Sequence, residues 1–355
     1  MTPEQLAAAT DGLATPALVV DLETADRNLA LAAGIASAGG LALRPHFKAH
    51  KCTRLLERQL AAGACSGVTC ATAAEAVVLA AAGIDAILVA NEVADPAGLN
   101  ALARAAALAD VTVCVDDPRH LELLAGTGAR LGVLIEIDVG QQRCGLSPGA
   151  PALLDLARMV TAAPALELRG LQGYEGHAVL RPADAERAAA VATAGEILRA
   201  ERDRLLAAGL PCPVLSGGGT GTLALAAEER TLTEVQAGSY VLMDATYGAL
   251  GLPFAQALFC RATVVSRHGG RVVLDAGLKA LSAEYGMPVA AAGGLTVTSL
   301  ADEHATAVAA GPAPGVGDAV LLVPAHVDPT VNLHPALHVV RADGAVDAWP
   351  VDGRR

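Results

Sequence analysis

The chain has 355 residues, 53% of them hydrophobic and 17% charged, which is the length and composition of a globular protein with a large core. Its formal net charge of −12 argues against a nucleic-acid surface, where clustered Lys and Arg are expected. The opening MTPEQLAAATDG has no basic stretch followed by an apolar one, and no apolar run reaches the roughly 18 residues of a membrane span. We therefore expect a cytoplasmic protein that binds small molecules, with neither nucleic acid nor membrane as partner.

Short runs of aliphatic and β-branched residues alternate with Ala- and Leu-rich stretches along the first two thirds of the chain, which is typical of βα units around a parallel sheet. Helical periodicity predicts helices between these runs, for example over 75–84 and 183–209. The eight predicted strands cover 41–47, 66–72, 86–92, 111–117, 131–138, 167–174, 213–218 and 234–243. Eight such units predict an α/β fold with a (β/α)8 TIM-type barrel.

Beyond about residue 250 the pattern changes to strands joined by Gly and Asp turns, as in CRATVVSRHGGRVVLDAG and DAVLLVPAHVD. We therefore expect a barrel domain over 26–249 and a C-terminal all-β domain over 250–355. The strand-like segment TPALVVDL precedes the first barrel helix, so we expect residues 1–25 to join the β domain.

The segment LRPHFKAHK places Lys48 at the C-terminal end of the first predicted barrel strand. Active sites of such barrels gather at that face, which makes Lys48 a candidate for chemistry. A solvated lysine at a strand end is the alternative.

A glycine-rich segment, SGGGTGT at 216–222, follows the seventh predicted strand and precedes a helical stretch. Its backbone N–H groups can line a phosphate without obstruction by Cβ atoms, although a flexible turn has the same composition. The segment GSY at 238–240, on the eighth predicted strand, can donate from Ser239 and the backbone to the same phosphate. A lysine, a phosphate cradle and nearby Tyr or Arg are what pyridoxal phosphate needs.

These motifs resemble the D-threonine aldolase and D-serine dehydratase family of alanine-racemase-type (fold type III) pyridoxal phosphate enzymes. The similarity runs nearly end to end, through TPALVVDL, RPHFKAHK, EIDVGQQRCG, LQGYEGH, SGGGTGT, QAGSYVLMD, DAGLKALS, DEH and PAHVDPTVNLH. It implies that the barrel binds the cofactor and that the protein is a homodimer. The residues it assigns to the cofactor are Lys48, Arg143, Tyr174, Ser216, Gly217, Gly218, Gly219, Thr220, Gly221, Gly238, Ser239 and Tyr240.

Within this resemblance, Lys48 is the Schiff-base lysine, Arg143 lies close to the cofactor ring and Tyr174 contacts its face or edge. A structural salt bridge is the alternative for Arg143. Many family members show Tyr-His-Gly where this chain has YEGH. The roles of Glu175 and His177 therefore stay open.

The triplet HVD at 326–328 contains two residues that would project to one face of a strand and grip one ion, leaving positions open for water and substrate. Structural hydrogen bonding is the alternative for such a pair. Within PAHVDPTVNLH it resembles the family's metal site, where dehydratases show His-x-Cys and aldolases His-x-Asp. The resemblance thus makes His326 and Asp328 metal ligands. Imidazole and carboxylate favour Mn²⁺ or Mg²⁺, and Zn²⁺ also accepts them.

The resemblance implies a carbon–carbon lyase that uses pyridoxal phosphate and a divalent metal to cleave D-3-hydroxy-α-amino acids such as D-threonine to glycine and an aldehyde. Its catalytic residues would be Lys48, His46, Arg143 and Tyr174, with a metal-bound water, His46 or His50 taking the hydroxyl proton. One alternative is a D-serine or D-3-hydroxyaspartate dehydratase of the same family, against which Asp328 speaks. The others are a racemase and a non-catalytic pyridoxal phosphate carrier.

Overall fold

The structure is a computed structural model that describes residues 1–181 and 184–354. Contacts between residues divide the chain into two compact units. The barrel unit comprises Ala32–Lys48 and Gln59–Gly238, and the β unit comprises Met1–Leu31, Ala49–Arg58 and the chain from Ser239 onward. Among the described residues, none of the helices has the length and apolar character needed to cross a membrane.

The barrel unit is built on an eight-stranded parallel sheet in the order β2-β9-β8-β7-β6-β5-β4-β3. Bridges between Leu43 and Cys65 and between His46 and Thr69 bring the β2 edge to the β3 edge, so the sheet curls round on itself. The strands are β2 (Ala42–Leu43), β3 (Val68–Cys70), β4 (Ala86–Val89), β5 (Asp110–Val115), β6 (Leu131–Glu136), β7 (Leu166–Gly173), β8 (Val214–Gly217) and β9 (Glu234–Val235). The predicted TIM-type barrel is confirmed.

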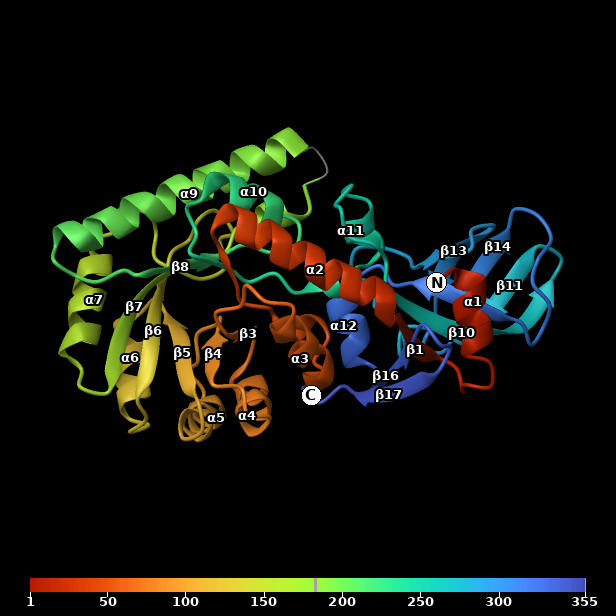
Figure 1. Ribbon diagram of the computed structural model, residues 1–355, viewed down its shortest axis with the longest axis horizontal. Coiled ribbons are helices and arrows are strands. Elements are labelled where there is room, and N and C mark those ends of the chain that lie inside the picture. The colour runs from red at the N-terminus through yellow and green to blue at the C-terminus, as the bar shows by residue number, and fades with distance from the viewer. Residues whose placement is uncertain (182–183, 355) are drawn as a thin grey trace. The chain divides into compact units, whose positions relative to one another are not determined.

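Helices follow the strands and lie around the outside of the sheet (Figure 1). Two of them begin where a side chain caps the first turn: Thr72 accepts from the Glu75 N–H before α4, and Asp95 from the Gly98 N–H before α5. The helices between strands are α4 (Ala73–Ala81), α5 (Pro96–Ala106), α6 (Pro118–Ala125), α7 (Ala152–Ala162), α8 (Gly176–Val179), α9 (Asp184–Ala207) and α10 (Leu223–Glu229). Two more, α2 (Leu22–Gly39) and α3 (Thr53–Ala61), have residues in both units. Residue 183, the start of one predicted helix, lies outside the described residues.

Two of the predicted strands are much shorter in the structure. The first ends at Leu43, because Pro45 has no N–H for the ladder, and a 3-10 turn, η1 (Phe47–Ala49), follows. The last ends at Val235. Residues 239–241 form a second 3-10 turn, η2 (Ser239–Val241), in which the Ser239 carbonyl accepts from the N–H groups of residues 242 and 243. The prediction that Ser239 and Tyr240 lie on a strand is therefore wrong.

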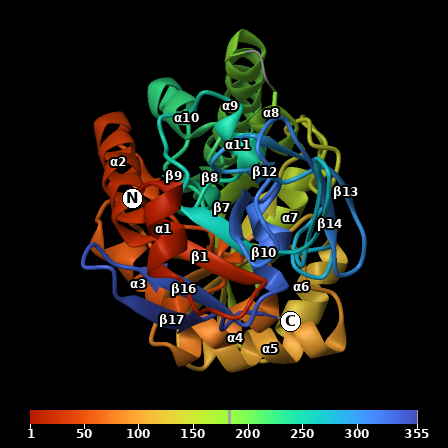
Figure 2. The same ribbon diagram turned by 90° about the vertical axis from the view of Figure 1, so that its right-hand side faces the viewer.

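The β unit holds a mostly antiparallel nine-stranded sheet in the order β11-β14-β13-β12-β15-β10-β1-β16-β17, and an added pairing of β11 with β10 closes six strands into a ring. The N-terminal strand β1 pairs with β10 and, in parallel, with β16 (Figure 2). The strands are β1 (Ala17–Asp21), β10 (Leu258–His268), β11 (Arg271–Leu274), β12 (Val289–Ala290), β13 (Leu295–Leu300), β14 (Ala305–Ala309), β15 (Ala319–Val323), β16 (Ala336–Val340) and β17 (Val346–Pro350). Its short helices are α1 (Pro3–Ala9), α11 (Ala245–Gly248) and α12 (Val327–Asn332).

Candidate active site

A chain of buried polar side chains runs from strand to strand at the carboxyl ends of the barrel strands. Successive members are joined by hydrogen bonds of 2.7 to 3.0 Å. The members are Arg44, Glu234, Ser216, Gln236, Gln172 and Glu136. Buried polar groups stabilise a fold only when they are paired, and a connected network also fixes side-chain orientation. The network thus holds the strand ends in register beneath the loops that carry the predicted cofactor residues.

Lys48 and His46 lie where β2 gives way to η1. The His46 N–H donates to the Ala237 carbonyl at 3.1 Å, and His46 forms a bridge with Thr69 in the middle of the neighbouring β3. Lys48 follows in η1 and is partly exposed. The structure therefore places Lys48 at the carboxyl end of the first barrel strand, the position that the sequence predicts.

Arg143 lies on the loop after β6, which is held from both sides. Asp138 Oδ1 accepts from the N–H groups of Gly140 and Gln142, both at 2.9 Å, and Asp116 Oδ2 accepts from the Gly145 N–H at 2.8 Å. The Arg143 guanidinium carbon lies 5.6 Å from the centroid of the Tyr174 ring, within cation–π range. The loop anchors thus bring two of the predicted cofactor residues together.

The alternative role for Arg143 is a structural salt bridge, and the structure contains one long ion pair of this kind. Its Nη2 atom lies 3.8 Å from Glu136 Oε1, too far for a hydrogen bond. Burial, followed by the neighbouring Glu92, raises the pKa of Glu136 to about 8. Burial therefore favours the protonated form of Glu136, which weakens its pairing with the Arg143 guanidinium.

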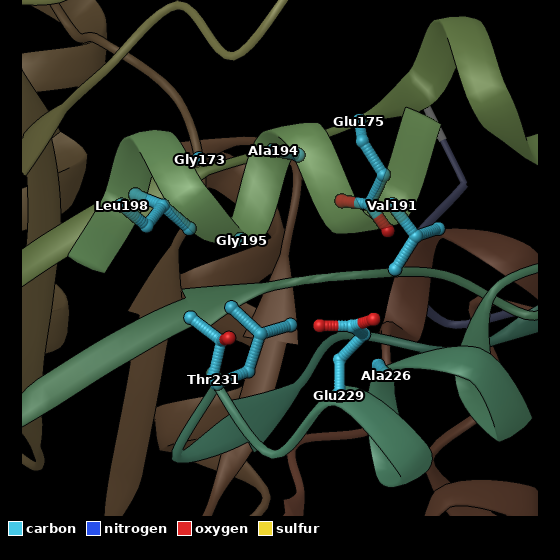
Figure 3. A pocket seen from close by; sticks show the side chains of 10 residues that line it. Gly173, Glu175, Val191, Ala194, Gly195, Leu198, Ala226, Glu229 and Thr231 are labelled. Carbon is cyan, nitrogen blue, oxygen red and sulfur yellow. The ribbon is translucent and has the colours of Figure 1, made fainter. Parts of the chain in front are cut away.

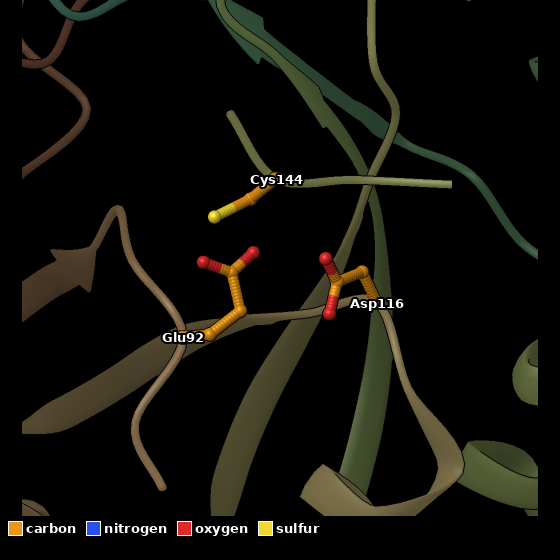
Figure 4. Close-up of side chains that lie close together, drawn as sticks. All are labelled: Glu92, Asp116 and Cys144. Atoms are coloured by element: carbon orange, nitrogen blue, oxygen red, sulfur yellow. The ribbon is translucent and has the colours of Figure 1, made fainter. Parts of the chain in front are cut away.

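Glu92, Asp116 and Cys144 converge beside this loop, with one ligand atom from each within 4.8 Å of the others (Figure 4). Burial, with Glu92 next, raises the pKa of the Cys144 thiol to about 11, so the thiol form is favoured in the protein without an ion. Asp116 is engaged with the loop backbone. Within this cluster, Asp116 thus supports the loop that carries Arg143. The sequence analysis missed these residues, although Glu136 ends β6, Asp116 directly follows β5, and Glu92 lies on the segment just after β4.

At the end of β8 and in the glycine-rich loop that follows, backbone carbonyl oxygens exclude a Cβ atom at two positions. A Cβ atom on Gly217 would lie 2.2 Å from the Gly173 carbonyl oxygen, and one on Gly221 would lie 2.3 Å from the Val179 carbonyl oxygen. Gly219 differs, because the nearest atoms to its ideal Cβ are 3.5 Å away or more and include Cε2 of the Tyr174 ring at 3.7 Å. The loop therefore packs tightly against backbone at Gly217 and Gly221, whereas a Cβ atom at Gly219 would make only ordinary contacts, one of them with the tyrosine ring.

Glu175 and His177, whose roles the sequence left open, lie at opposite sides of this region. The Glu175 side chain is 3% exposed and accepts from the Gly218 N–H at 3.1 Å and from the Thr222 hydroxyl at 2.7 Å. The His177 ring lies against Gly140, and its Nδ1 is buried with no hydrogen-bond partner among the described residues. Glu175 is thus tied to the glycine-rich loop, while His177 lies beside the Arg143 loop.

The predicted metal ligands lie in the β unit, although not on a strand. β15 ends at Val323, and His326 instead precedes the helix α12, with Asp328 in its first turn, so the strand argument for this triplet is wrong. The two side chains converge all the same, with His326 Nε2 and Asp328 Oδ1 3.9 Å apart. The Asp244 carboxylate accepts from the Val327 N–H at 2.9 Å and fixes the turn between them.

The GSY segment contains the boundary between the two units. Gly238 is the last residue of the barrel unit, and Ser239 begins the last segment of the β unit. The Ser239 hydroxyl donates to Asp328 Oδ1 at 3.3 Å, and the buried Tyr240 ring lies 5.6 Å from that of Phe254. Within the β unit, Ser239 is therefore a neighbour of the predicted metal ligand.

A further carboxylate, Glu284, lies at the far side of the His326 ring. Its Oε2 atom is 2.9 Å from His326 Nδ1, and the ring of the adjacent Tyr285 lies 4.8 Å from the imidazole. An N–H on Nδ1 that donates to a carboxylate fixes the tautomer in which Nε2 carries the lone pair toward Asp328. Sequence reasoning missed Glu284 because the contact spans 42 residues.

Comparisons with known proteins agree with this architecture. The model of the alanine racemase N-terminal domain matches residues 20–246, and that of a putative serine dehydratase domain matches residues 257–340. The fold is thus that of the alanine-racemase-type enzymes.

Relatives that match nearly the whole chain identify the family more specifically. The chain is 42% identical to a D-threonine aldolase from Arthrobacter sp over 96% of this chain and 92% of that one. The crystal structure of a D-threonine aldolase from Filomicrobium marinum matches with a TM-score of 0.92 at 39% identity, over 96% and 95% of the two chains. A D-threo-3-hydroxyaspartate dehydratase from Delftia sp. HT23 matches with a TM-score of 0.84 at 31% identity, over 96% and 97%. The chain belongs to the alanine-racemase-type family that includes these enzymes, and it is a lyase.

Proposed function

We propose that the chain is a pyridoxal phosphate- and divalent-metal-dependent aldolase that cleaves D-3-hydroxy-α-amino acids, D-threonine among them, to glycine and an aldehyde. The observation that carries this proposal is the convergence of His326 and Asp328, which supplies an imidazole and a carboxylate with no thiolate. The identity to D-threonine aldolase supports it.

The chemistry of the predicted cofactor residues suits a pyridoxal phosphate group. We assign the amine of Lys48 to its aldehyde, the backbone of 216–221 with Gly238, Ser239 and Tyr240 to its phosphate, and Arg143 and Tyr174 to its ring. The place of the Tyr174 ring, beside Gly219 of the glycine-rich loop, supports the assignment. When bound, the cofactor supplies an electron sink for the pair of electrons left on the substrate Cα.

The β-unit residues fit a single divalent ion. Two ligand atoms on one ion at bond lengths near 2.1 Å lie at most about 4.2 Å apart, and His326 Nε2 and Asp328 Oδ1 meet that limit at 3.9 Å. We assign these two side chains to the ion, which when bound acts as a Lewis acid toward the β-hydroxyl. A carboxylate in the ligand pair favours Mn²⁺ or Mg²⁺ over Zn²⁺.

The reaction also requires a group that accepts and transfers the proton of the β-hydroxyl. We assign this role to His46 at a ring nitrogen or to a water that the metal ligands retain, because His46 lies on the strand end two residues from Lys48. We also propose a cofactor-binding domain over 26–249, a β domain over 250–355 joined by residues 1–25, and a cytoplasmic homodimer. The family models, which meet between residues 246 and 257, support the domain bounds.

A dehydratase of the same family is the second candidate, since the Delftia enzyme shares the fold at 31% identity. The two functions differ in product. Incubation of the purified protein with D-threonine, D-serine or D-3-hydroxyaspartate, with and without Mn²⁺, is expected to yield glycine and an aldehyde from D-threonine, to lose activity with a chelator and to regain it with Mn²⁺. Ammonia and a 2-oxo acid in place of glycine would identify a dehydratase and refute the aldolase.

A further inference from the structure

We infer that Glu175 is a positioning residue for the glycine-rich loop and determines how tightly the protein holds the phosphate group of its cofactor. The inference rests on the proposed function, since it takes 216–221 as the phosphate loop. It concerns the residue at which this chain departs from the Tyr-His-Gly pattern, and it is drawn from contacts within the barrel unit alone.

The first argument is the placement of the carboxylate. Figure 3 shows Glu175 directed into the space between α9 and α10, in a pocket that is also lined by Val191 and Glu229. Tyr174, one residue earlier, lies instead beside Gly219 and Arg143. The two neighbours therefore lie on different sides of the loop: the tyrosine borders the side assigned to the cofactor, and the carboxylate supports the loop from behind.

The second argument is what the carboxylate holds. Its two oxygens accept from the Gly218 N–H and the Thr222 hydroxyl, which lie on either side of residues 219–221 of the loop. Thr222 Oγ1 also accepts from the Gly219 N–H at 3.0 Å, and the Thr222 N–H donates to the Gly219 carbonyl at 3.1 Å. One buried side chain thus closes the loop into a single hydrogen-bonded turn.

The third argument is that glycine carries no conformational preference of its own. Gly218 has a φ of +74°, and four of the six residues from 216 to 221 are glycine, so the loop without its anchor would sample many conformations. A ligand that must order its loop binds more weakly than one that meets a preorganised loop. Because the proposed function assigns this loop to the phosphate group alone, the effect should be specific to phosphorylated forms of the cofactor.

The test compares pyridoxal phosphate with pyridoxal, which keeps the aldehyde and ring and lacks the phosphate. Apoprotein is titrated with each compound, and binding is followed by the change in visible absorbance on linkage to the lysine. Glu175→Ala is expected to weaken pyridoxal phosphate binding at least tenfold and to leave pyridoxal binding within about twofold. Glu175→Gln, which keeps one acceptor oxygen, is expected to weaken pyridoxal phosphate binding about threefold.

The matched control is Glu201→Gln. Glu201 is also 3% exposed and accepts from a glycine N–H, that of Gly149 at 2.6 Å, but it lies outside the loop. This variant is expected to keep the wild-type ratio of the two affinities. A Glu175→Ala protein that binds both compounds more weakly by the same factor, or an unchanged ratio in Glu175→Gln, would overturn the inference. Should Glu175→Ala fail to fold, the Glu175→Gln ratio decides. A wild-type protein without preference for the phosphorylated form would instead refute the cofactor assignment itself.

Discussion

Replacement of Glu284 by Gln tests the assignment of His326 as a metal ligand without changing a ligand. The Glu284 carboxylate accepts from His326 Nδ1 at 2.9 Å and so keeps the lone pair on Nε2. Glutamine has nearly the same shape and keeps an acceptor oxygen, but it lacks the negative charge. The substitution therefore removes the electrostatic support of the imidazole and its preference for one tautomer.

The expected size of the effect on metal affinity follows from the solvent exposure of Glu284 and His326. A hydrogen bond to a charged group is worth about 1.5–3 kcal/mol when buried, and exposed ion pairs are worth about 0.2–1 kcal/mol. The Glu284 side chain is 53% exposed and that of His326 is 17% exposed, so we take about 1 kcal/mol. This corresponds to about a fivefold weaker affinity for the ion.

The assay is a titration of metal-free protein with Mn²⁺ against a chromophoric chelator. Glu303→Gln is the matched control, because Glu303 is 61% exposed and pairs with Lys279 at 2.6 Å in the same unit. We expect the Mn²⁺ dissociation constant to rise about fivefold in Glu284→Gln and to stay unchanged in Glu303→Gln. Equal constants for both variants would refute the reasoning.

Two further predictions concern the barrel unit. The raised pKa of Glu136, about 8 and caused by burial and Glu92, contributes stability that is complete below the unfolded value near 4.5 and is lost as the pH rises through 8. Between pH 5 and pH 8, Glu136→Gln should therefore gain stability relative to wild type. Thermal melts over this range would detect the trend, and its absence would contradict the raised pKa of Glu136. Gly221→Ala should lower the free energy of unfolding by about 1–3 kcal/mol because of the contact with Val179. Gly219→Ala should leave stability within about 0.5 kcal/mol and weaken cofactor binding, and equal denaturation midpoints for the two alanine variants would contradict the loop packing.

The sequence predicts the fold well because local pattern determines most of it. Each predicted barrel run coincides with a strand, since apolar runs between helical stretches have few other ways to be buried. The errors arise where a local feature interrupts the run. Pro45 ends β2 early, and at Ser239 a turn replaces the expected strand although the residues remain apolar.

In the candidate site, the sequence predicts only those residues that belong to recognisable motifs. Lys48 and the glycine-rich loop are visible in the sequence because strand position and glycine content mark them. The role of Glu175, which the sequence left open, and the presence of Glu284 are not visible, because their partners lie 47 and 42 residues away and no spacing rule connects them. The HVD triplet shows a third case, in which the two side chains converge through a helix start rather than a strand.

The central claim is that the amine of Lys48 forms a covalent link with the aldehyde of pyridoxal phosphate. The chain has three lysines, Lys48, Lys51 and Lys279, so a single peptide map separates all candidates. Protein incubated with pyridoxal phosphate is reduced with borohydride, digested and analysed by mass spectrometry. We predict one pyridoxyl adduct, on the peptide that contains Lys48, and its loss in Lys48→Arg. An adduct confined to another lysine, or none at all, would contradict the account.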